Sequence, residues 1–170
     1  MSLALSRRLA ALSLAVAALS AMAAPPSETL QVAGAVRAPL ALGVADLRSF
    51  PPEQIASVTL PRRVDGREAA STVRGVRLSA VLERAGIAAT GHHDWKSLVV
   101  LASATDGYRV SFSWPELVNT PVGAGVLVVF ERDGQPLDDG EGAIALVSAQ
   151  DLRTGPRHVR WLDRIELRQP

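Results

Sequence analysis

The chain has 170 residues and a formal net charge of +1, and this length accommodates one ordinary domain with a hydrophobic core. The near-balance of 18 basic and 17 acidic residues excludes an overall basic field for nucleic acid, so no nucleic-acid partner is expected. The absence of cysteine excludes disulfides, thiolate nucleophiles and thiolate metal ligands.

Residues 1–23 are predicted to form a secretory signal peptide. Two arginines precede a run of small apolar residues at 9–19, and residues 21–23 place alanine at both recognition positions of a signal peptidase. The run is shorter than the roughly 20 residues of a membrane-spanning helix, and Pro25 would stop a helix; an uncleaved anchor is the alternative. We therefore expect a periplasmic protein whose mature part, 24–170, is a single domain with 16 basic and 17 acidic residues.

The first half of this domain alternates between strand-like and helix-like patterns. Leu78, Val81, Leu82 and Ala85 share one face at helical spacing, and Gly86 is placed to end that helix. We expect strands over residues 29–33, 55–60 and 73–78, a short helix or turn over 42–49, a loop over 62–70 and a helix over 78–85.

The second half predicts strands joined by tight turns. Asp106-Gly107 separates two apolar runs as in a hairpin, and Ser113 is placed to cap a short helix with Pro115 in its first turn. We expect strands over residues 97–103, 108–112 and 125–131, a second turn at 133–134, an apolar segment at 143–147 and a terminal strand over 158–168. The order predicts a β-rich α+β domain with short helices.

Four stretches of the sequence resemble a known family when taken in order. They are residues 34–39 with 45–47 (GAVRAP, ADL), 73–78 with 81–86 (VRGVRL, VLERAG), 104–108 (ATDGY), and 151–162 with 164–167 (DLRTGPRHVRWL, RIEL). This order resembles the molybdopterin-binding domain of the sulfite-oxidase superfamily over nearly all of the mature chain. The resemblance implies a β-rich α+β fold of mixed sheets with short helices.

One position departs from the pattern of that family. In its enzymes a cysteine follows the strand that residues 55–60 resemble, and its sulfur binds molybdenum. The corresponding stretch here is Leu60-Pro61-Arg62-Arg63, so no thiolate-bound molybdenum is expected. Short relatives without this cysteine include periplasmic pterin-binding proteins that partner membrane sensors, and the chain resembles them in length, predicted export and missing cysteine.

The organic half of the cofactor supplies the candidate site. Members of the family hold the pterin and its phosphate near the C-terminus; Arg157, Arg160 and Trp161 match that segment, and His158 stands where a small hydroxyl residue often lies. A pterin ring is flat and has an edge that accepts hydrogen bonds from arginine and donates them to a carboxylate, while an aromatic ring can stack on its face. The candidate ligand-binding residues are Arg62, Asp106, Tyr108, Arg153, Arg157, His158 and Arg160.

Each candidate also has a purely structural interpretation. The arginines are alternatively solvated surface residues, Asp106 is alternatively only a turn residue, and Trp161 is predicted to be a core residue. The residues at 92–94 (HHD) are predicted to be an exposed loop rather than a metal site, and the acidic residues around 133–141 a solvated turn rather than a calcium loop. No Gly-x-Ser-x-Gly motif supports a hydrolase.

The leading hypothesis is a non-catalytic periplasmic binding protein for a pterin-like ligand that passes a signal to a membrane partner, such as the periplasmic domain of a sensor. The first alternative is a molybdopterin-dependent oxidoreductase or accessory subunit without the metal-binding cysteine, partnered by a membrane redox subunit. The second alternative is a protein–protein adaptor. A pocket lined by Arg153 and Arg157 would favour a ligand, whereas surface ion pairs of these two arginines would favour an adaptor.

Overall fold

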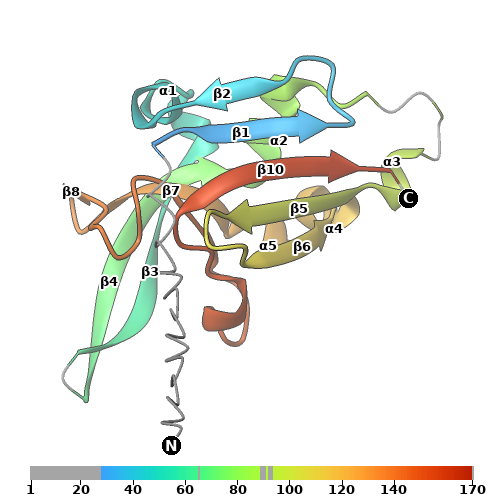
Figure 1. Cartoon of the computed structure of the whole chain (residues 1–170). Helices are drawn as coiled ribbons and strands as arrows, with labels where there is room; N and C mark the ends of the chain where they lie inside the picture. Colours follow the sequence, from blue (N-terminus) through green and yellow to red (C-terminus); the bar gives the residue numbers. More distant parts are fainter. Residues whose placement is uncertain (1–27, 65, 89–90, 92–93, 170) are drawn as a thin grey trace, which may run out of the picture.

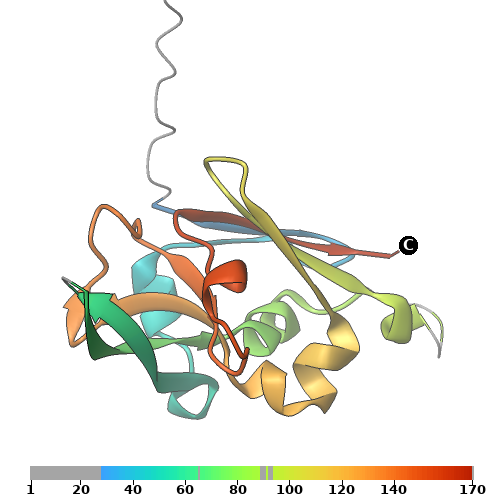
Figure 2. The same cartoon turned by 90° about the horizontal axis from the view of Figure 1, so that it is seen from below.

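The computed structural model describes residues 28–64, 66–88, 91 and 94–169. The predicted signal peptide and the pair at 92–93 lie outside the described residues. Two sheets lie face to face, and short helices lie at several places around them (Figures 1 and 2). None of the helices in the described part is long and apolar enough to cross a membrane.

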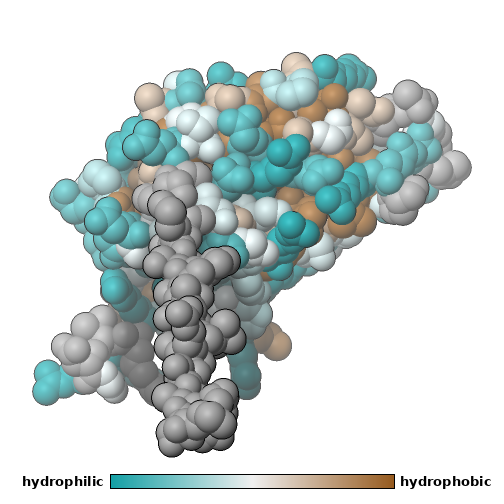
Figure 3. Space-filling view, in the orientation of Figure 1, coloured by the Kyte–Doolittle hydropathy of each residue, from teal (hydrophilic) through white to brown (hydrophobic). Residues whose placement is uncertain are grey.

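Five strands form the first sheet: β1 (Leu30–Gly34), β2 (Leu40–Leu42), β5 (Val99–Ala104), β6 (Arg109–Ser113) and β10 (Leu162–Arg168). Their order is β2-β1-β10-β5-β6. β1 and β10 are parallel, with Val32 opposite Ile165, and the other neighbours are antiparallel. The outer face of this sheet, which is turned to the viewer in Figure 3, carries both hydrophilic and hydrophobic side chains. Alternate residues of β5 and β6 are buried, so the core lies against the other face.

The second sheet contains β3 (Ile55–Val64), β4 (Arg67–Arg77), β7 (Val126–Arg132), β8 (Gln135–Pro136) and β9 (Ala145–Ser148). Its order is β3-β4-β7-β8, with β9 also paired to β7, and all pairs are antiparallel. The two long strands β3 and β4 form a ribbon that extends beyond the rest of the sheet (Figure 1). Every residue from Val126 to Phe130 is buried, so β7 packs on both faces.

Short helices pack at several places around the core. They are α1 (Val44–Arg48), η1 (Pro52–Gln54), α2 (Leu78–Ala85), α3 (Asp94–Ser97), α4 (Trp114–Asn119), α5 (Pro121–Ala124) and η2 (Gly155–Arg157). α2 ends at Gly86, whose φ of 69° is favourable only for a residue without a side chain. α4 begins as predicted, because Ser113 Oγ accepts a 3.1 Å hydrogen bond from the amide of Glu116. The mixed sheets with short helices confirm the predicted β-rich α+β class.

Two of the predicted elements are wrong in detail. Residues 62–70 are not a loop, because β3 and β4 remain paired as far as Val64, which lies opposite Arg67. The backbone hydrogen bonds between the two strands continue beyond the point where the apolar alternation of the sequence ends. The terminal strand begins at Leu162 rather than at residue 158, since Trp161 has a φ of 48° and breaks the extended backbone. The segment before this break lies at the surface and forms the candidate site.

Candidate functional site

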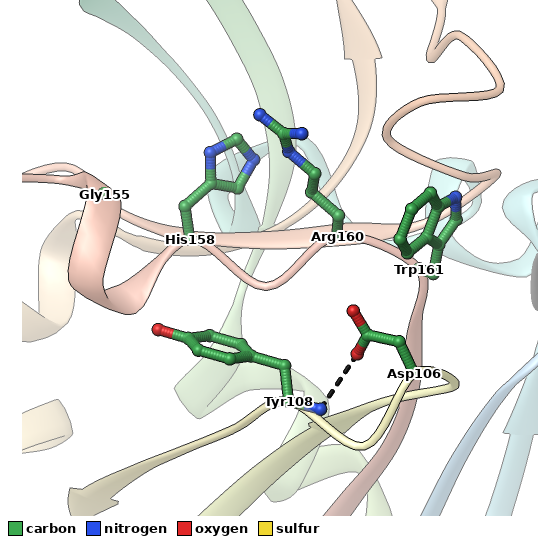
Figure 4. A pocket seen from close by; sticks show the side chains of 6 residues that line it. All are labelled: Asp106, Tyr108, Gly155, His158, Arg160 and Trp161. Atoms are coloured by element: carbon green, nitrogen blue, oxygen red, sulfur yellow. Dashed lines mark hydrogen bonds between the residues drawn. The ribbon is translucent and has the colours of Figure 1, made fainter.

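Two neighbouring hollows open around the segment before β10. The first hollow has a volume of about 370 Å³ and is lined by Asp106, Tyr108, Gly155, His158, Arg160 and Trp161 (Figure 4). The second hollow has a volume of about 160 Å³ and is lined by Leu60, Pro61, Arg62, Ser71, Arg132, Glu141, Thr154, His158 and Arg160. His158 and Arg160 belong to both hollows. Four predicted site residues therefore meet at the first hollow, and Arg62 joins two of them at the second.

The β5–β6 turn supplies one wall of the first hollow. The amide of Tyr108 donates a 2.8 Å hydrogen bond to Asp106 Oδ1, an Asx-type turn in which Gly107 adopts a φ of 88°. The Tyr108 hydroxyl donates to the carbonyl oxygen of Pro156 at 2.7 Å and so ties this turn to η2. The turn interpretation of Asp106 is thus correct, and the same residue also lines the hollow.

Trp161 lies beside this wall instead of in the core, so its predicted core position is wrong. Its left-handed backbone rotates the indole out of the alternation that Val159 begins. The indole N–H donates to the carbonyl oxygen of Asp139 at 2.8 Å, and the backbone N–H donates to that of Glu141 at 2.7 Å. Both contacts hold the ring at the edge of the first hollow, where it can stack on a flat ligand.

His158 and Arg160 form the wall shared by the two hollows. Val159 between them is fully buried, so the alternation of an extended segment places both side chains on its outer side. Figure 4 shows both side chains leaving the segment on the same side, while Asp106 and Tyr108 of the β5–β6 turn lie on its other side. Arg160 is exposed and has no hydrogen bond or ion pair within the described part of the chain.

A charged network forms the inner wall of the second hollow. Arg132 donates to Ser71 Oγ at 2.6 Å and to Glu141 Oε1 at 3.0 Å, and His158 Nε2 lies 3.0 Å from Glu141 Oε2. Burial by itself would raise the pKa of Glu141, but the hydrogen bond with His158 and the charges of His158 and Arg132 lower it to about 2. The prediction of a solvated acidic turn is therefore wrong for Glu141.

Arg157 points away from both hollows. Its Nε donates to Asp151 Oδ2 at 2.7 Å and its Nη1 donates to Glu116 Oε1 at 3.0 Å, while the guanidinium lies 4.5 Å from the centre of the Phe112 ring. These partners raise the pKa of Arg157 above its usual value, and the hydrogen bond from Arg157 lowers that of Asp151. Arg157 therefore clamps the loop that carries η2 onto α4 and β6.

Arg153 is exposed and lines neither hollow. Because neither Arg153 nor Arg157 lines a hollow, these two arginines give no support to a ligand site. The ion pairs of Arg157 are of the kind expected of an adaptor. Support for a ligand comes instead from the other five predicted residues and from Trp161.

Sequence reasoning missed Ser71, Arg132 and Glu141. Each lies in a different part of the sequence, and no local spacing brings them together. The one available signal was Arg132, a charged residue two positions after the apolar run Val126–Phe130, where a partly buried charge needs a partner.

The fold and the two hollows define a class of protein: a small α+β domain of two sheets with an aromatic and cationic surface site. The family model for the oxidoreductase molybdopterin binding domain matches residues 19–170, and the chain belongs to that family.

Two similar proteins place this membership in context. The chain is 31% identical over 145 residues to mitochondrial sulfite oxidase of Macaca fascicularis, covering 75% of this chain and 26% of that protein. The crystal structure of the sulfane dehydrogenase SoxCD from Paracoccus pantotrophus superposes with a TM-score of 0.64 at 20% identity, over 84% of this chain and 38% of that one. The chain thus spans about a quarter of the sulfite oxidase that it matches.

Membership implies a molybdopterin cofactor, and the two halves of that cofactor fit these residues differently. The pterin half fits, because the hollows present a carboxylate, two aromatic rings and cationic side chains. The thiolate-bound metal does not fit, because the sequence contains no cysteine. Among the described residues, no group of three or more His, Asp or Glu side chains could hold a metal ion in its place.

Proposed function

We propose that this chain is a non-catalytic periplasmic binding protein for a pterin-like ligand. The observation that carries the proposal is the first hollow, in which a carboxylate (Asp106), two rings (Tyr108 and Trp161) and two basic side chains (His158 and Arg160) line one space of about 370 Å³. Pockets of roughly 300–1,000 Å³ with a few convergent polar groups are typical of small-molecule sites.

The hydrogen bonds already made in the hollow determine what remains for a ligand. Asp106 Oδ1 accepts from its own turn, which leaves Oδ2 to accept from the amino group and ring N–H of a pterin. The polar atoms of Tyr108 and Trp161 are used by backbone carbonyl oxygens, so these residues offer their ring faces. Arg160 makes no hydrogen bond within the described residues, so its five N–H donors remain for a ligand.

A fluorescence titration with neopterin and 7,8-dihydroneopterin tests this proposal. Asp106→Asn preserves the turn, because the amide oxygen still accepts from Tyr108, but it removes the charge that would face the ligand. We expect at least tenfold weaker binding for Asp106→Asn and no change for Glu53→Gln, an exposed carboxylate on η1. If neither pterin binds the unchanged protein below about 1 mM, which corresponds to ~4 kcal/mol, the proposal fails.

The proposal includes export and a membrane partner. Residues 1–23 support export, and mass spectrometry of protein from the periplasm should find a mature chain that begins near residue 24. The clamped loop supports a partner, because Gly155 lines the first hollow while the neighbouring Leu152 is fully exposed. A ligand-dependent complex with the periplasmic domain of a membrane sensor is the expected result, and a complex that is indifferent to ligand would favour the adaptor.

A molybdopterin-dependent oxidoreductase, or an accessory subunit of one, is the second candidate, and family membership favours it. The missing thiolate counts against it, because no side chain of this chain replaces that soft ligand. Metal analysis of protein purified from its native periplasm distinguishes the two. We expect pterin without stoichiometric molybdenum, and one molybdenum per chain would overturn the choice.

A further inference from the structure

Leu152 is the most exposed large apolar side chain in the described part of the chain. It lies on the η2 loop, residues 149–161, which also carries the walls of the two hollows. This loop is held in place, because Arg157 donates hydrogen bonds to Asp151 beside Leu152 and to Glu116 on α4. A leucine that is fixed outside the core by its own loop is preorganised for burial against another molecule.

The outer half of the β3–β4 ribbon is a second exposed feature. Backbone pairing continues past Leu60 and Ser71, but the described side chains beyond that pair, at positions 61, 62 and 67–70, are all exposed. A two-stranded ribbon without a buried face has little stability of its own and gains it by packing on a further surface. The ribbon also carries a hollow of about 350 Å³, lined by Pro61, Arg62, Glu68 and Ala69.

The η2 loop and the ribbon flank the second hollow. Pro61 and Arg62 line this hollow from the ribbon, and Thr154, two residues after Leu152, lines it from the loop. Figure 1 shows both segments projecting on the same side of the two sheets. A surface that contacted Leu152 and the ribbon together would therefore lie across the open side of the second hollow.

We define the docking face as Leu152 and Arg153 together with ribbon residues 61, 62 and 67–70. Its charge is mainly positive. Arg62, Arg67 and Arg153 are exposed, and none of them makes an ion pair within the described residues. Glu68 is the one carboxylate in the docking face as defined. The complementary surface would have an apolar socket for Leu152 with carboxylates around it.

The docking face suits a protein better than a lipid bilayer or an added strand. Surfaces that enter a bilayer present several large apolar side chains, whereas here Leu152 is accompanied by small residues such as Ala69. A bilayer also has no projection that fills the hollow on the ribbon. Strand addition is disfavoured, because β3 is an edge strand on which Pro61 has no N–H to donate.

We propose that the docking face binds a partner protein through an apolar socket rimmed with carboxylates, and that the bound partner closes the second hollow. This inference deepens the function proposed above and rests on it for the ligand. It names the face that the partner covers and the chemistry of the surface that fits there. Closure makes the two binding events interdependent, because a ligand behind the interface leaves only after the partner has opened it.

Photo-crosslinking in the native periplasm tests the docking face. The photoreactive residue p-benzoylphenylalanine replaces Leu152 in one variant and Ala69 in a second. In the control it replaces Trp95, an exposed residue of α3 at the other end of the molecule (Figure 1). We expect positions 152 and 69 to crosslink to the same protein and position 95 not to. Different proteins at 152 and 69, a lipid product, or no product would each overturn the inference.

The crosslinked protein is then purified, and its affinity for variants of this chain is measured by calorimetry. Leu152→Ala and Arg153→Gln should each weaken the complex at least tenfold with an unchanged melting temperature, because both side chains are exposed. The effect of Arg153→Gln should shrink as ionic strength rises. Arg164→Gln, which removes the same charge from the outer face of the first sheet, should leave the affinity intact. An affinity of Leu152→Ala within twofold of the unchanged protein would overturn the inference.

Neopterin release tests the closure and separates this inference from the proposed function. The partner should slow the release of neopterin at least tenfold in stopped-flow fluorescence, and an unchanged rate would overturn the closure. A complex that depends on Leu152 in a protein that binds no pterin would support the docking face and overturn the pterin function. Pterin binding without a shared crosslink at positions 152 and 69 would do the reverse.

Discussion

The partly buried network of Arg132, Glu141 and His158 predicts how stability depends on pH. Replacing Glu141 with Gln keeps the shape of the side chain but removes the charge that both neighbours contact. The pKa of Glu141 falls from an ordinary 4.5 to about 2, which corresponds to roughly 3 kcal/mol at 1.36 kcal/mol per pH unit. Solvent at the open side of the hollow screens part of this, so we expect Glu141→Gln to lower the free energy of unfolding by about 1–3 kcal/mol at pH 7.

The sign of the pH dependence follows from the direction of the pKa change. A carboxylate whose pKa is lower in the folded state stabilises fully above the pKa of the unfolded chain, and this contribution is lost as pH falls from about 4.5 toward 2. Urea unfolding of both proteins at pH 7, 4.5 and 3 measures the contribution. The difference between them should be largest at pH 7 and clearly smaller at pH 3. A difference that stays constant over this range would refute the assignment of charge to Glu141.

Three further predictions concern the walls of the site. Arg157→Met should lower the free energy of unfolding by about 2–4 kcal/mol in urea titrations, because Asp151 and Glu116 lose their partner; a change below about 0.5 kcal/mol would contradict the clamp. Gly142→Ala should lower the free energy of unfolding by at least 1 kcal/mol more than Gly134→Ala does. Both glycines have a φ near 80°, but a Cβ at Gly142 would lie 2.6 Å from the Trp161 ring, whereas a Cβ at Gly134 would contact nothing within 4 Å. Equal melting temperatures of the two variants would contradict this packing. Tyr108→Phe should keep the ring but lose the hydrogen bond to Pro156, costing about 0.5–1.5 kcal/mol of unfolding free energy with little change in pterin affinity; a large loss of affinity would show that the hydroxyl contacts the ligand.

Local chemistry made much of the fold predictable. The Asp106-Gly107 turn between apolar runs correctly indicated the β5–β6 hairpin, and Ser113 before Pro115 correctly indicated the start of α4. These features are determined by neighbours in the sequence. The continuation of β3 and β4 past Leu60 was not predictable in this way, because that part of the ribbon is held by backbone pairing and its side chains are mostly exposed.

The site was predictable in its residues but less so in their roles. The resemblance drew attention to Arg157, Arg160 and Trp161 together, and nothing in their spacing distinguishes an arginine that faces a hollow from one that is paired. Glu116 and Asp151 determine that difference for Arg157, and they lie 41 and 6 residues away. Trp161 was misplaced for a similar reason, since its left-handed backbone is stabilised by contacts with Asp139 and Glu141 in another loop.

This division of roles affects how mutations of the segment should be interpreted. Arg157 holds the loop from one end and Trp161 holds it from the other, and His158 and Arg160 lie between them. Removing Arg157 would therefore weaken ligand binding by releasing this loop, even though its guanidinium points away from both hollows. Loss of binding identifies a contact residue only when the melting temperature is unchanged. Arg160 should meet that condition, because it makes no ion pair within the described residues, whereas Arg157 should not.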